Sequence, residues 1–346
     1  MKLLVLGGTR FLGYYVVLEA LKRGHEVTTF NRGKTDRGVH SRVKELYGDR
    51  DGGLHVLQSD EWDAVIDTCG YLPRLVRASA RELADRVGQY TFISSISVYK
   101  DLSVPRSHED SDVLELEDES IEDIPNHYGA LKARCEQVLD GVMPGRVLTV
   151  RPGLIVGPKD PTDRFTYWPV RMSRGGEMLC PGRGDSEVQF IDVRDLAQWT
   201  VVMTEAKRTG VYNAAGPGVA LTMREFLERG REALGSRAVF TWCDEAFLAE
   251  HEVRGWSDLP VWLPSGGQLS EYRGILQADY SKAMKAGLTF RTVEETVLDT
   301  VRFHGQRGDG AQWKAGLSAA RETELLALWH GRMSGEQTAG GSGEAG

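Results

Sequence analysis

The sequence predicts an α/β fold, in which a doubly wound parallel sheet is accompanied by a smaller C-terminal lobe. Short apolar runs alternate with segments of helical spacing throughout residues 1–150. Gly is in excess, with 40 of the 346 residues, and some of these glycines directly follow the first apolar run. The composition changes after Arg151, where Pro, Gly, Trp and Arg cluster. Because strands that alternate with helices form parallel sheets with helices on both faces, residues 1–150 are expected to form the core.

The predicted elements begin with a βαβ unit at the first residues. An apolar run at 3–6 predicts a buried strand, 12–23 has helical spacing before Gly24, and 26–30 predicts a second strand. Further strands are expected at 43–47, 64–68, 89–94, 146–150 and 210–213, with helices at 74–87 and 128–139. The last strand follows residue 151 and is expected to return to the core.

Composition excludes several classes of protein. With 42 basic and 50 acidic residues the net charge is -8, so we expect no nucleic-acid partner. Hydrophobic residues at 41% and charged residues at 27% are typical of a soluble globular chain. The four cysteines are widely spaced, so no disulfide framework and no metal site are expected, and a reducing, cytoplasmic compartment fits. No apolar stretch approaches the roughly 20 residues that cross a bilayer, so no membrane contact is expected.

A glycine-rich loop at 7–13, Gly-Gly-Thr-Arg-Phe-Leu-Gly, lies between the first strand and the first helix. At this position backbone N–H groups and the helix dipole bind the pyrophosphate of a dinucleotide. The spacing is G-x-x-R-x-x-G rather than G-x-G-x-x-G. A turn that binds no ligand is the alternative, but the place at the start of a βαβ unit favours a Rossmann-type nucleotide site. The residues expected to contact the cofactor are Gly7, Thr9, Arg10, Phe11, Leu12 and Gly13.

The end of the second strand, Asn31 and Arg32, bears on which cofactor binds. An NAD site usually has an acidic residue here for the ribose 2'-hydroxyl, whereas an Arg suits a 2'-phosphate. Asn31 does not repel a phosphate, Arg32 can pair with it, and Arg10 could add a second positive charge. We therefore expect NADP(H) to be favoured, with NAD(H) as the other candidate. The alternative is that Arg32 is a solvated turn residue.

Catalytic candidates lie at Tyr128 and Lys132, four residues apart on one face of a helix. A positive Lys stabilises phenolate, so such a Tyr can exchange protons with a substrate oxygen nearer neutral pH. An exposed helix pair is the alternative. The apolar strand before Ser95 and Ser97 ends in hydroxyl residues at the edge where open α/β sheets bind ligands. Ser95 is expected to hydrogen-bond the reacting oxygen, and turn capping is the alternative.

These motifs, followed by Arg-Pro-Gly-Leu-Ile-Val-Gly-Pro at 151–158 and Phe-Ile-Asp-Val-Arg-Asp at 190–195, occur in the order seen in extended short-chain dehydrogenase/reductases. The sequence resembles the NAD-dependent epimerase/dehydratase family from residue 1 to about 215. The Arg in the glycine loop and Asn31 resemble a branch with G-G-T-R-F-[IL]-G loops, which also includes chloroplast stem-loop RNA-binding proteins.

The resemblance implies roles for residues that the pattern alone does not assign. Ser95, Tyr128 and Lys132 would form the catalytic triad, with Lys132 also on the nicotinamide ribose. Further cofactor contacts would come from the ends of later strands, at Asp49, Arg50, Cys69, Gly70, Pro152 and Leu154. A homodimer is what the family suggests.

The chain that follows the expected nicotinamide contacts at Pro152 and Leu154 is expected to form the substrate lobe. The chain would then consist of an NAD(P)-binding Rossmann core at 1–150, a substrate lobe at 151–332, and a disordered tail at 333–346. An anionic or sugar-like substrate could be bound by polar and aromatic groups there and by the serine-rich strand end. The candidates are Ser97, Arg164, Tyr167, Trp168 and Arg171. A structural loop packed by its aromatic side chains is the alternative.

Three functions remain open from the sequence. The first is an NADP(H)-dependent oxidoreductase that moves a hydride between nicotinamide C4 and a carbonyl or secondary alcohol carbon, with Tyr128 transferring the proton. The second is a sugar or nucleotide-sugar epimerase or dehydratase that retains its cofactor. The third is a non-catalytic RNA-binding member of the family, against which the net charge of -8 weighs.

Overall fold

The computed structural model describes residues 1–34, 41–307 and 312–340. The chain divides into two compact units, and each unit is assembled from three segments. The first unit contains Met1–Lys159, Gln189–Val219 and Gly274–Arg291. The second unit contains Asp160–Val188, Ala220–Arg273 and Thr292–Gly346. The chain therefore returns to the first unit twice after residue 159.

A seven-stranded parallel sheet forms the centre of the first unit. Its strands are β1 (Lys2–Leu6), β2 (Glu26–Asn31), β3 (Lys44–Tyr47), β4 (Trp62–Asp67), β5 (Val87–Ile93), β6 (Val147–Pro152) and β10 (Gly210–Ala214). Their order across the sheet is β10-β6-β5-β4-β1-β2-β3. The strand expected at 210–213 does join this sheet, beside β6.

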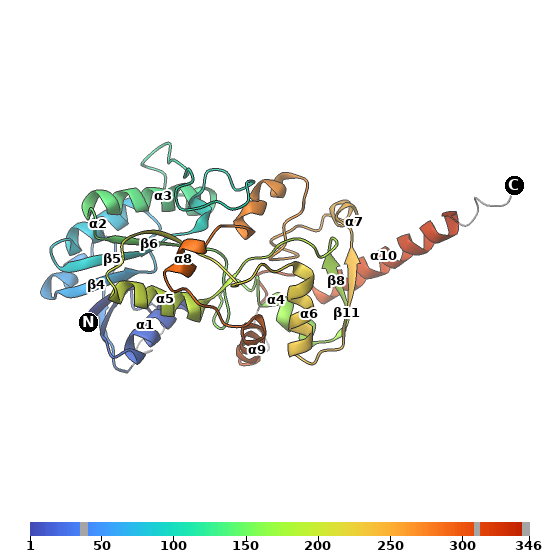
Figure 1. The fold of residues 1–346 in the computed structure, drawn as a ribbon, viewed down its shortest axis with the longest axis horizontal. Coiled ribbons are helices and arrows are strands. Elements are labelled where there is room, and N and C mark those ends of the chain that lie inside the picture. The colour runs from blue at the N-terminus through green and yellow to red at the C-terminus, as the bar shows by residue number, and fades with distance from the viewer. Residues whose placement is uncertain (35–40, 308–311, 341–346) are drawn as a thin grey trace. The chain divides into compact units, whose positions relative to one another are not determined.

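Helices cover both faces of this sheet (Figure 1). Alternate side chains of a strand point to opposite faces, and β1 shows the consequence. Leu3 and Val5 belong to a core with α1 (Phe11–Lys22) and α5 (Val193–Glu205). Leu4 and Leu6 belong to a second core with α2 (Pro73–Leu83) and α3 (Ile124–Val142). The doubly wound α/β fold expected from the sequence is confirmed.

Smaller elements complete the first unit. They are η1 (Leu54–Ser59), η2 (Ile96–Val98), β7 (Ile155–Val156), β9 (Ile191–Asp192) and α8 (Ser281–Lys285). Helix α3 begins earlier than the expected 128, at Ile124, and has non-helical dihedral angles at His127. The regular helix therefore resumes at Tyr128.

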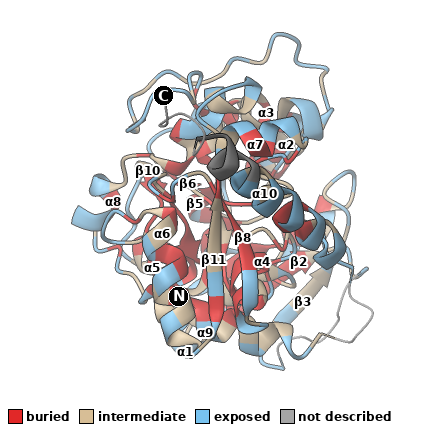
Figure 2. Ribbon diagram, turned by 90° about the vertical axis from the view of Figure 1, so that its right-hand side faces the viewer, coloured by how far each residue is buried: buried red, intermediate tan, exposed pale blue. Residues whose placement is uncertain are grey.

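The second unit contains five helices and a pair of parallel strands among its described residues. They are α4 (Tyr167–Ser173), β8 (Gly176–Pro181), α6 (Met223–Ala233), β11 (Ala238–Cys243), α7 (Glu245–Glu250), α9 (Val293–His304) and α10 (Ala319–Gly340), and η3 (Gln268–Leu276) spans a boundary between the units. Figure 2 shows β11 mostly in the tan of intermediate burial. Helix α10 reaches Gly340 and so includes residues 333–340 of the expected tail, and its earlier turns bury Leu325 and Leu326. The rest of that tail, residues 341–346, lies outside the described residues. Within the described residues, no helix combines the length and the apolar character that a bilayer span requires.

Candidate functional site

The carboxyl ends of all seven strands lie at one edge of the sheet, because the strands are parallel. Leu6 at the end of β1 is in register with Phe30 of β2 and with Asp67 of β4. Ile93 at the end of β5 is likewise in register with Val150 of β6. The segments that follow these strands carry most of the residues singled out in the sequence, so the fold brings them to one edge, where open α/β sheets bind ligands.

The glycine loop packs too closely for side chains. Gly7 and Gly8 have φ of 105° and 95°, a conformation that favours glycine. A Cβ on Gly13 would lie 2.7 Å from the backbone N of Gly8. Arg10 is the N-cap of α1, and its side chain makes no capping hydrogen bond. The start of α1 is thus a backbone cradle of the kind that binds phosphate, and it fits the pyrophosphate of a dinucleotide.

Around this cradle lie the other loop residues. Thr9 is partly buried, and Phe11 begins α1 with φ of 37°. Leu12 is buried in the core beneath α1. The side chain of Leu12 therefore packs inward, which leaves its backbone N–H as the group that a ligand could use.

At the end of β2, Asn31 presents a donor. Its Oδ1 accepts a hydrogen bond from the backbone N of Gly33 at 2.8 Å. Its Nδ2 is buried and has no partner among the described residues. Arg32 is exposed. A donor and a cation, with no carboxylate at either position, fit an acceptor group such as a phosphate.

Arg50 and Asp67 form a buried ion pair below this edge. Asp67 is fully buried, and both of its oxygens accept from the Arg50 guanidinium. The hydroxyl of Tyr90 donates to Asp67 at 2.8 Å, and Arg50 also donates to Ser79. Burial acts to raise the pKa of Asp67, but the Arg50 charge and these hydrogen bonds hold it below its usual value.

The neighbouring cofactor candidates lie on either side of this pair. Asp49 is exposed, and its Oδ1 accepts from the backbone N of Asp51 at 3.0 Å. Cys69, which follows β4, is exposed, whereas Gly70 is buried. A Cβ at position 70 would lie 2.7 Å from the Phe92 ring, so there is no room for a side chain. Pro152 ends β6 and is buried.

Lys132 is anchored between the ends of two strands. Its Nζ donates to the carbonyl of Gly70 at 2.7 Å, after β4, and to that of Ile93 at 2.5 Å, at the end of β5. The ammonium lies 4.1 Å from the centroid of the Phe92 ring. The residue is 2% exposed, and this burial lowers the pKa of Lys132 to about 8. A lysine held in this way is rigid and carries its charge at neutral pH.

Tyr128 lies one turn before Lys132 on α3 and is partly exposed. The helix packs against η2 so closely that a Cβ on Gly129 would lie 2.1 Å from the Ser97 carbonyl oxygen. Ser95 is the N-cap of η2, and its Oγ accepts from the backbone N of Ser97 at 3.1 Å and contacts Ser97 Oγ at 3.0 Å. This close packing brings the turn that contains Tyr128 next to the serine-rich end of β5.

We expect Gly129→Ala to destabilise the protein by about 1–3 kcal/mol, because the added methyl group pushes α3 away from η2. The matched control is Gly141→Ala on the same helix, where a Cβ meets nothing within 4 Å. Ala is the better helix former, so the control should hold or raise stability. Denaturant unfolding of both variants provides the measurement. Equal stabilities would contradict the packing argument.

The sequence did not predict a buried ion pair between Glu136 of α3 and Arg151 of β6. Arg151 Nη2 lies 2.6 Å from Glu136 Oε2, and Ser94 Oγ donates to the same carboxylate. Glu136 lies one turn after Lys132, so the pair ties the Lys132 helix to β5 and β6. The available signal was the helical spacing from Lys132 to Glu136, together with a charged residue, Arg151, inside an apolar strand.

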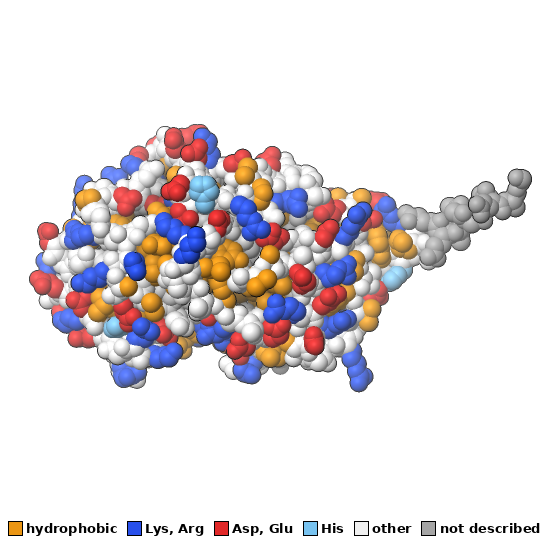
Figure 3. Space-filling model, in the orientation of Figure 1, with side chains coloured by type: hydrophobic (Ala, Val, Ile, Leu, Met, Phe, Trp, Pro, Cys, Tyr) orange, Lys and Arg blue, Asp and Glu red, His pale blue; other side chains and the backbone are white. Residues whose placement is uncertain are grey.

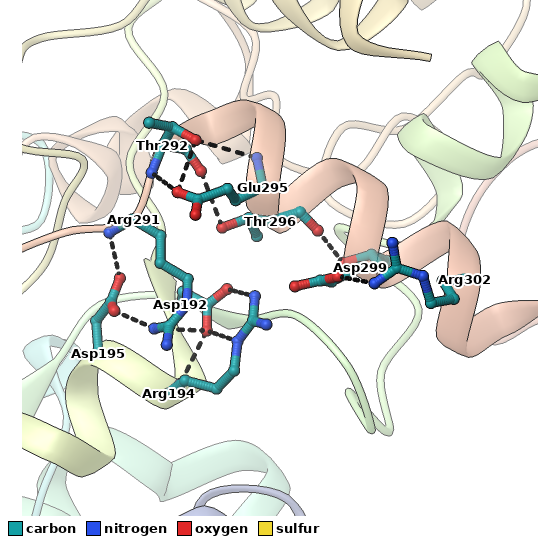
Figure 4. A network of polar contacts seen from close by, with 10 residues as sticks. Asp192, Arg194, Asp195, Arg291, Thr292, Glu295, Thr296, Asp299 and Arg302 are labelled. Atoms are coloured by element: carbon teal, nitrogen blue, oxygen red, sulfur yellow. Dashed lines mark hydrogen bonds and ion pairs between the residues drawn. The ribbon is translucent and has the colours of Figure 1, made fainter.

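Two further motif segments pair with each other as β7 and β9, with Ile155 opposite Ile191. The carbonyl of Leu154 accepts from Ile191 N, and Asp192 caps α5 through the backbone N of Arg194. Figure 4 shows Asp192 and Asp195 with the guanidinium groups that neutralise them, and it also draws the cap at the start of α9. Burial raises the pKa of Asp195 to about 6. The described contacts give these acidic side chains a structural role.

The four lobe residues expected to contact substrate all belong to the second unit. Trp168 is fully buried and donates from its indole to the carbonyl of Pro260 at 2.6 Å. Tyr167 is buried beside it, and Arg171 pairs with Glu322 at 2.6 Å. Arg164 stacks 5.0 Å from the Trp256 ring. Tyr167, Trp168 and Arg171 thus take part in the packing of this unit, which favours the structural alternative that the sequence left open.

Comparison with known proteins supports the same interpretation of the fold. The sequence profile of the NAD dependent epimerase/dehydratase family matches residues 58–215. Among curated proteins, the chain is 27% identical over 234 residues to the chloroplast stem-loop binding protein of 41 kDa b of Arabidopsis thaliana. That match covers 62% of this chain and 58% of the relative, so the chain spans little more than half of the relative's length.

Solved structures resemble the chain over most of its length. UDP-glucuronic acid 4-epimerase from Bacillus cereus, in complex with NAD, matches with a TM-score of 0.63 and 18% identity, over 88% of this chain and 99% of that one. UDP-N-acetylglucosamine 4-epimerase from the same organism matches with a TM-score of 0.65 and 16% identity, over 90% and 99% of the two chains. At these identities the likeness concerns the fold. The chain therefore shares the fold of these epimerases, and its residues 58–215 match the NAD dependent epimerase/dehydratase family.

Proposed function

We propose that the protein is an NADP(H)-dependent oxidoreductase whose chemistry takes place at Tyr128 and Lys132. The anchoring of Lys132 to the carbonyls of Gly70 and Ile93 is the observation that carries the proposal. These two hydrogen bonds fix the ammonium one turn from the Tyr128 phenol, and burial lowers the pKa of Lys132 to about 8, as is typical of lysines in catalytic sites. The alternative, that Tyr128 and Lys132 are an exposed pair on the surface of a helix, does not fit the burial of Lys132, which is 2% exposed.

The cofactor, when bound at the glycine loop, supplies a hydride donor or acceptor at nicotinamide C4. The chain's own residues handle the oxygen of the substrate. Ser95 Oγ hydrogen-bonds that oxygen, and Tyr128 gives a proton to it in reduction or takes one from it in oxidation. Lys132 stabilises the phenolate that Tyr128 becomes. The substrate class is a carbonyl compound or a secondary alcohol.

The preference for NADP(H) rests on Asn31 and Arg32. We expect Arg32→Asp to weaken NADPH binding by about tenfold or more, because the variant loses a charge-assisted hydrogen bond and gains a repulsive carboxylate. Binding of NADH should change little. Titration of both nucleotides against wild type and variant, followed by nicotinamide fluorescence, measures the two affinities.

Lys34→Asp provides the matched control, since Lys34 is an exposed cation two residues from Arg32. It makes the same change in net charge and should affect NADPH binding less. Tighter binding of NADH than of NADPH by the wild type would overturn the proposed preference. An equal loss in the two variants would mean that general charge, rather than Arg32, attracts the nucleotide.

A second candidate is a nucleotide-sugar epimerase or dehydratase, favoured by the solved structures that resemble the chain, two of which are UDP-sugar 4-epimerases. An epimerase regenerates its cofactor in each turnover and has no need to release it. Native mass spectrometry of the purified protein separates the candidates. Retained NAD would support the epimerase, and exchangeable NADP(H) would support the oxidoreductase.

A third candidate is RNA binding, suggested by the name of the Arabidopsis relative. On the face drawn in Figure 3, basic and acidic side chains are interspersed. A surface that neutralises phosphates gathers basic groups instead. Affinity for structured RNA without any affinity for nicotinamide nucleotides would favour this candidate over the enzyme.

A further inference from the structure

Tyr71 lies beside both candidate catalytic groups. It follows Gly70 and directly precedes Leu72, the N-cap of α2. The centroid of its ring is 6.4 Å from that of Tyr128, with an angle of 42° between the planes. Lys132 Nζ lies 5.4 Å from the same centroid. Tyr71 is 43% exposed, so packing in the hydrophobic core does not account for its position beside these two residues.

The Lys132 ammonium is therefore surrounded by groups that favour a cation. Two are backbone carbonyls, and two are aromatic rings, Phe92 at 4.1 Å and Tyr71 at 5.4 Å from their centroids. The face of an aromatic ring carries partial negative charge and attracts ammonium groups within about 6 Å. Burial opposes the charge and lowers the pKa of Lys132 to about 8. The rings and carbonyls limit that loss.

Other ionisable groups also act on Lys132, from each element packed against it. Asp67 and Glu136 favour the charged form, and Arg50 disfavours it. The set of charged and titratable groups around the ammonium comprises Arg50, Asp67, Cys69, Tyr71, Cys135 and Glu136. Among them Tyr71 alone also contacts the Tyr128 ring in the described contacts. Its ring is thus the group through which both members of the pair can be held.

We propose that Tyr71 is a positioning residue, whose ring face keeps Lys132 protonated and aligned beside Tyr128. The inference rests on the proposed function, because it assigns a role relative to the Tyr128 and Lys132 pair. The ring performs this role, and the hydroxyl does not. Phe at this position should serve equally well, whereas a ring without a negative face should not.

The test uses the titration of the Tyr128 phenol, which requires no substrate. The protein is labelled with ¹³C at tyrosine Cζ, and the Tyr128 signal is assigned by its loss in Tyr128→Phe. Three replacements of Tyr71 are compared: Phe, Leu and pentafluorophenylalanine, the last introduced by site-specific incorporation. The fluorinated ring keeps the shape and the cover over Lys132 but lacks the negative face.

We expect Tyr71→Phe to titrate as the wild type does. In the Leu and pentafluoro variants Lys132 should lose its proton about 0.5–1 pH unit earlier. The Tyr128 phenolate then loses its cation, so the Tyr128 midpoint should move to higher pH by several tenths of a unit. Leu also admits water, which works in the opposite direction, so the pentafluoro variant is the decisive one.

Lys132→Met distinguishes a failure of the proposed function from a failure of the proposed role of Tyr71. If this variant leaves the Tyr128 midpoint unchanged, Tyr128 and Lys132 are not coupled, and the proposed function loses its basis. If Lys132→Met raises the midpoint but the pentafluoro variant matches the wild type, the coupling stands and the role of Tyr71 is refuted. Thermal unfolding of each variant confirms that the comparison is between folded proteins.

Discussion

Tyr128→Phe is expected to lower kcat by about 10²–10⁴-fold on any substrate that the protein turns over, while the affinity for the nicotinamide nucleotide stays close to wild type. The variant loses one oxygen atom at a partly exposed position and keeps the ring that contacts Tyr71. Packing is therefore preserved, and only the proton donor and acceptor is removed. Steady-state rates followed by nicotinamide absorbance, together with nucleotide titration, measure the two quantities.

The matched control is Tyr272→Phe, which removes the same atom from a tyrosine of the second unit that is 48% exposed. It should leave kcat unchanged. The pH dependence of kcat provides a second check, because burial places the pKa of Lys132 near 8. Activity that relies on a charged Lys132 should decline as the pH rises through that value. A fully active Tyr128→Phe enzyme would refute the assignment of Tyr128.

Local sequence pattern was sufficient to predict the seven strands of the main sheet and helices α1, α2 and α3, whereas α5 and α8 were not predicted. The strands are continuous apolar runs because parallel strands are buried on both faces, as β1 and β6 show by being almost wholly buried. The glycine loop could also be predicted, because Gly7 and Gly8 have positive φ and Gly13 packs against the backbone of Gly8, which leaves no room for a side chain. These features depend on neighbours in the chain, which the sequence displays directly.

Features that depend on distant partners were not predicted. Arg50 and Asp67 are 17 residues apart, and nothing in the sequence indicates that one guanidinium is paired with one buried carboxylate. In the second unit, the sequence left open whether the aromatic and basic residues bind substrate or pack the loop. By residue type alone, Trp168 and Arg171 are typical ligand-binding residues. In the structure, however, they contact Pro260 and Glu322, which are distant in the sequence, and these contacts hold the second unit together. Exposure and partner choice come from the tertiary fold.

Arg50→Leu is expected to destabilise the protein by about 3–5 kcal/mol at neutral pH, because it leaves the Asp67 carboxylate buried without its counter-ion. Asp67 is fully buried, and the Arg50 side chain is 11% exposed, so little water reaches the pair. The double variant Arg50→Leu/Asp67→Asn removes the uncompensated charge and should recover most of the loss. Arg74→Leu provides a surface control, since Arg74 pairs with Asp51 and Glu122 and is half exposed. Its stability should stay close to wild type.

The stability difference between Arg50→Leu and wild type should change with pH, whereas a loss of packing alone would be independent of pH. In the wild type the folded pKa of Asp67 is lowered, so the pair contributes stability above the unfolded value of about 3.9 and loses it as the pH falls through the folded value. In Arg50→Leu only burial and the neutral donors act on Asp67, and burial raises its pKa. The variant should therefore gain stability relative to wild type as the pH is lowered from 7 towards about 5, where the carboxylate takes up a proton. Urea unfolding of both proteins across this range measures the difference, and a deficit that stays constant with pH would assign the loss to packing and exclude the buried charge as its cause.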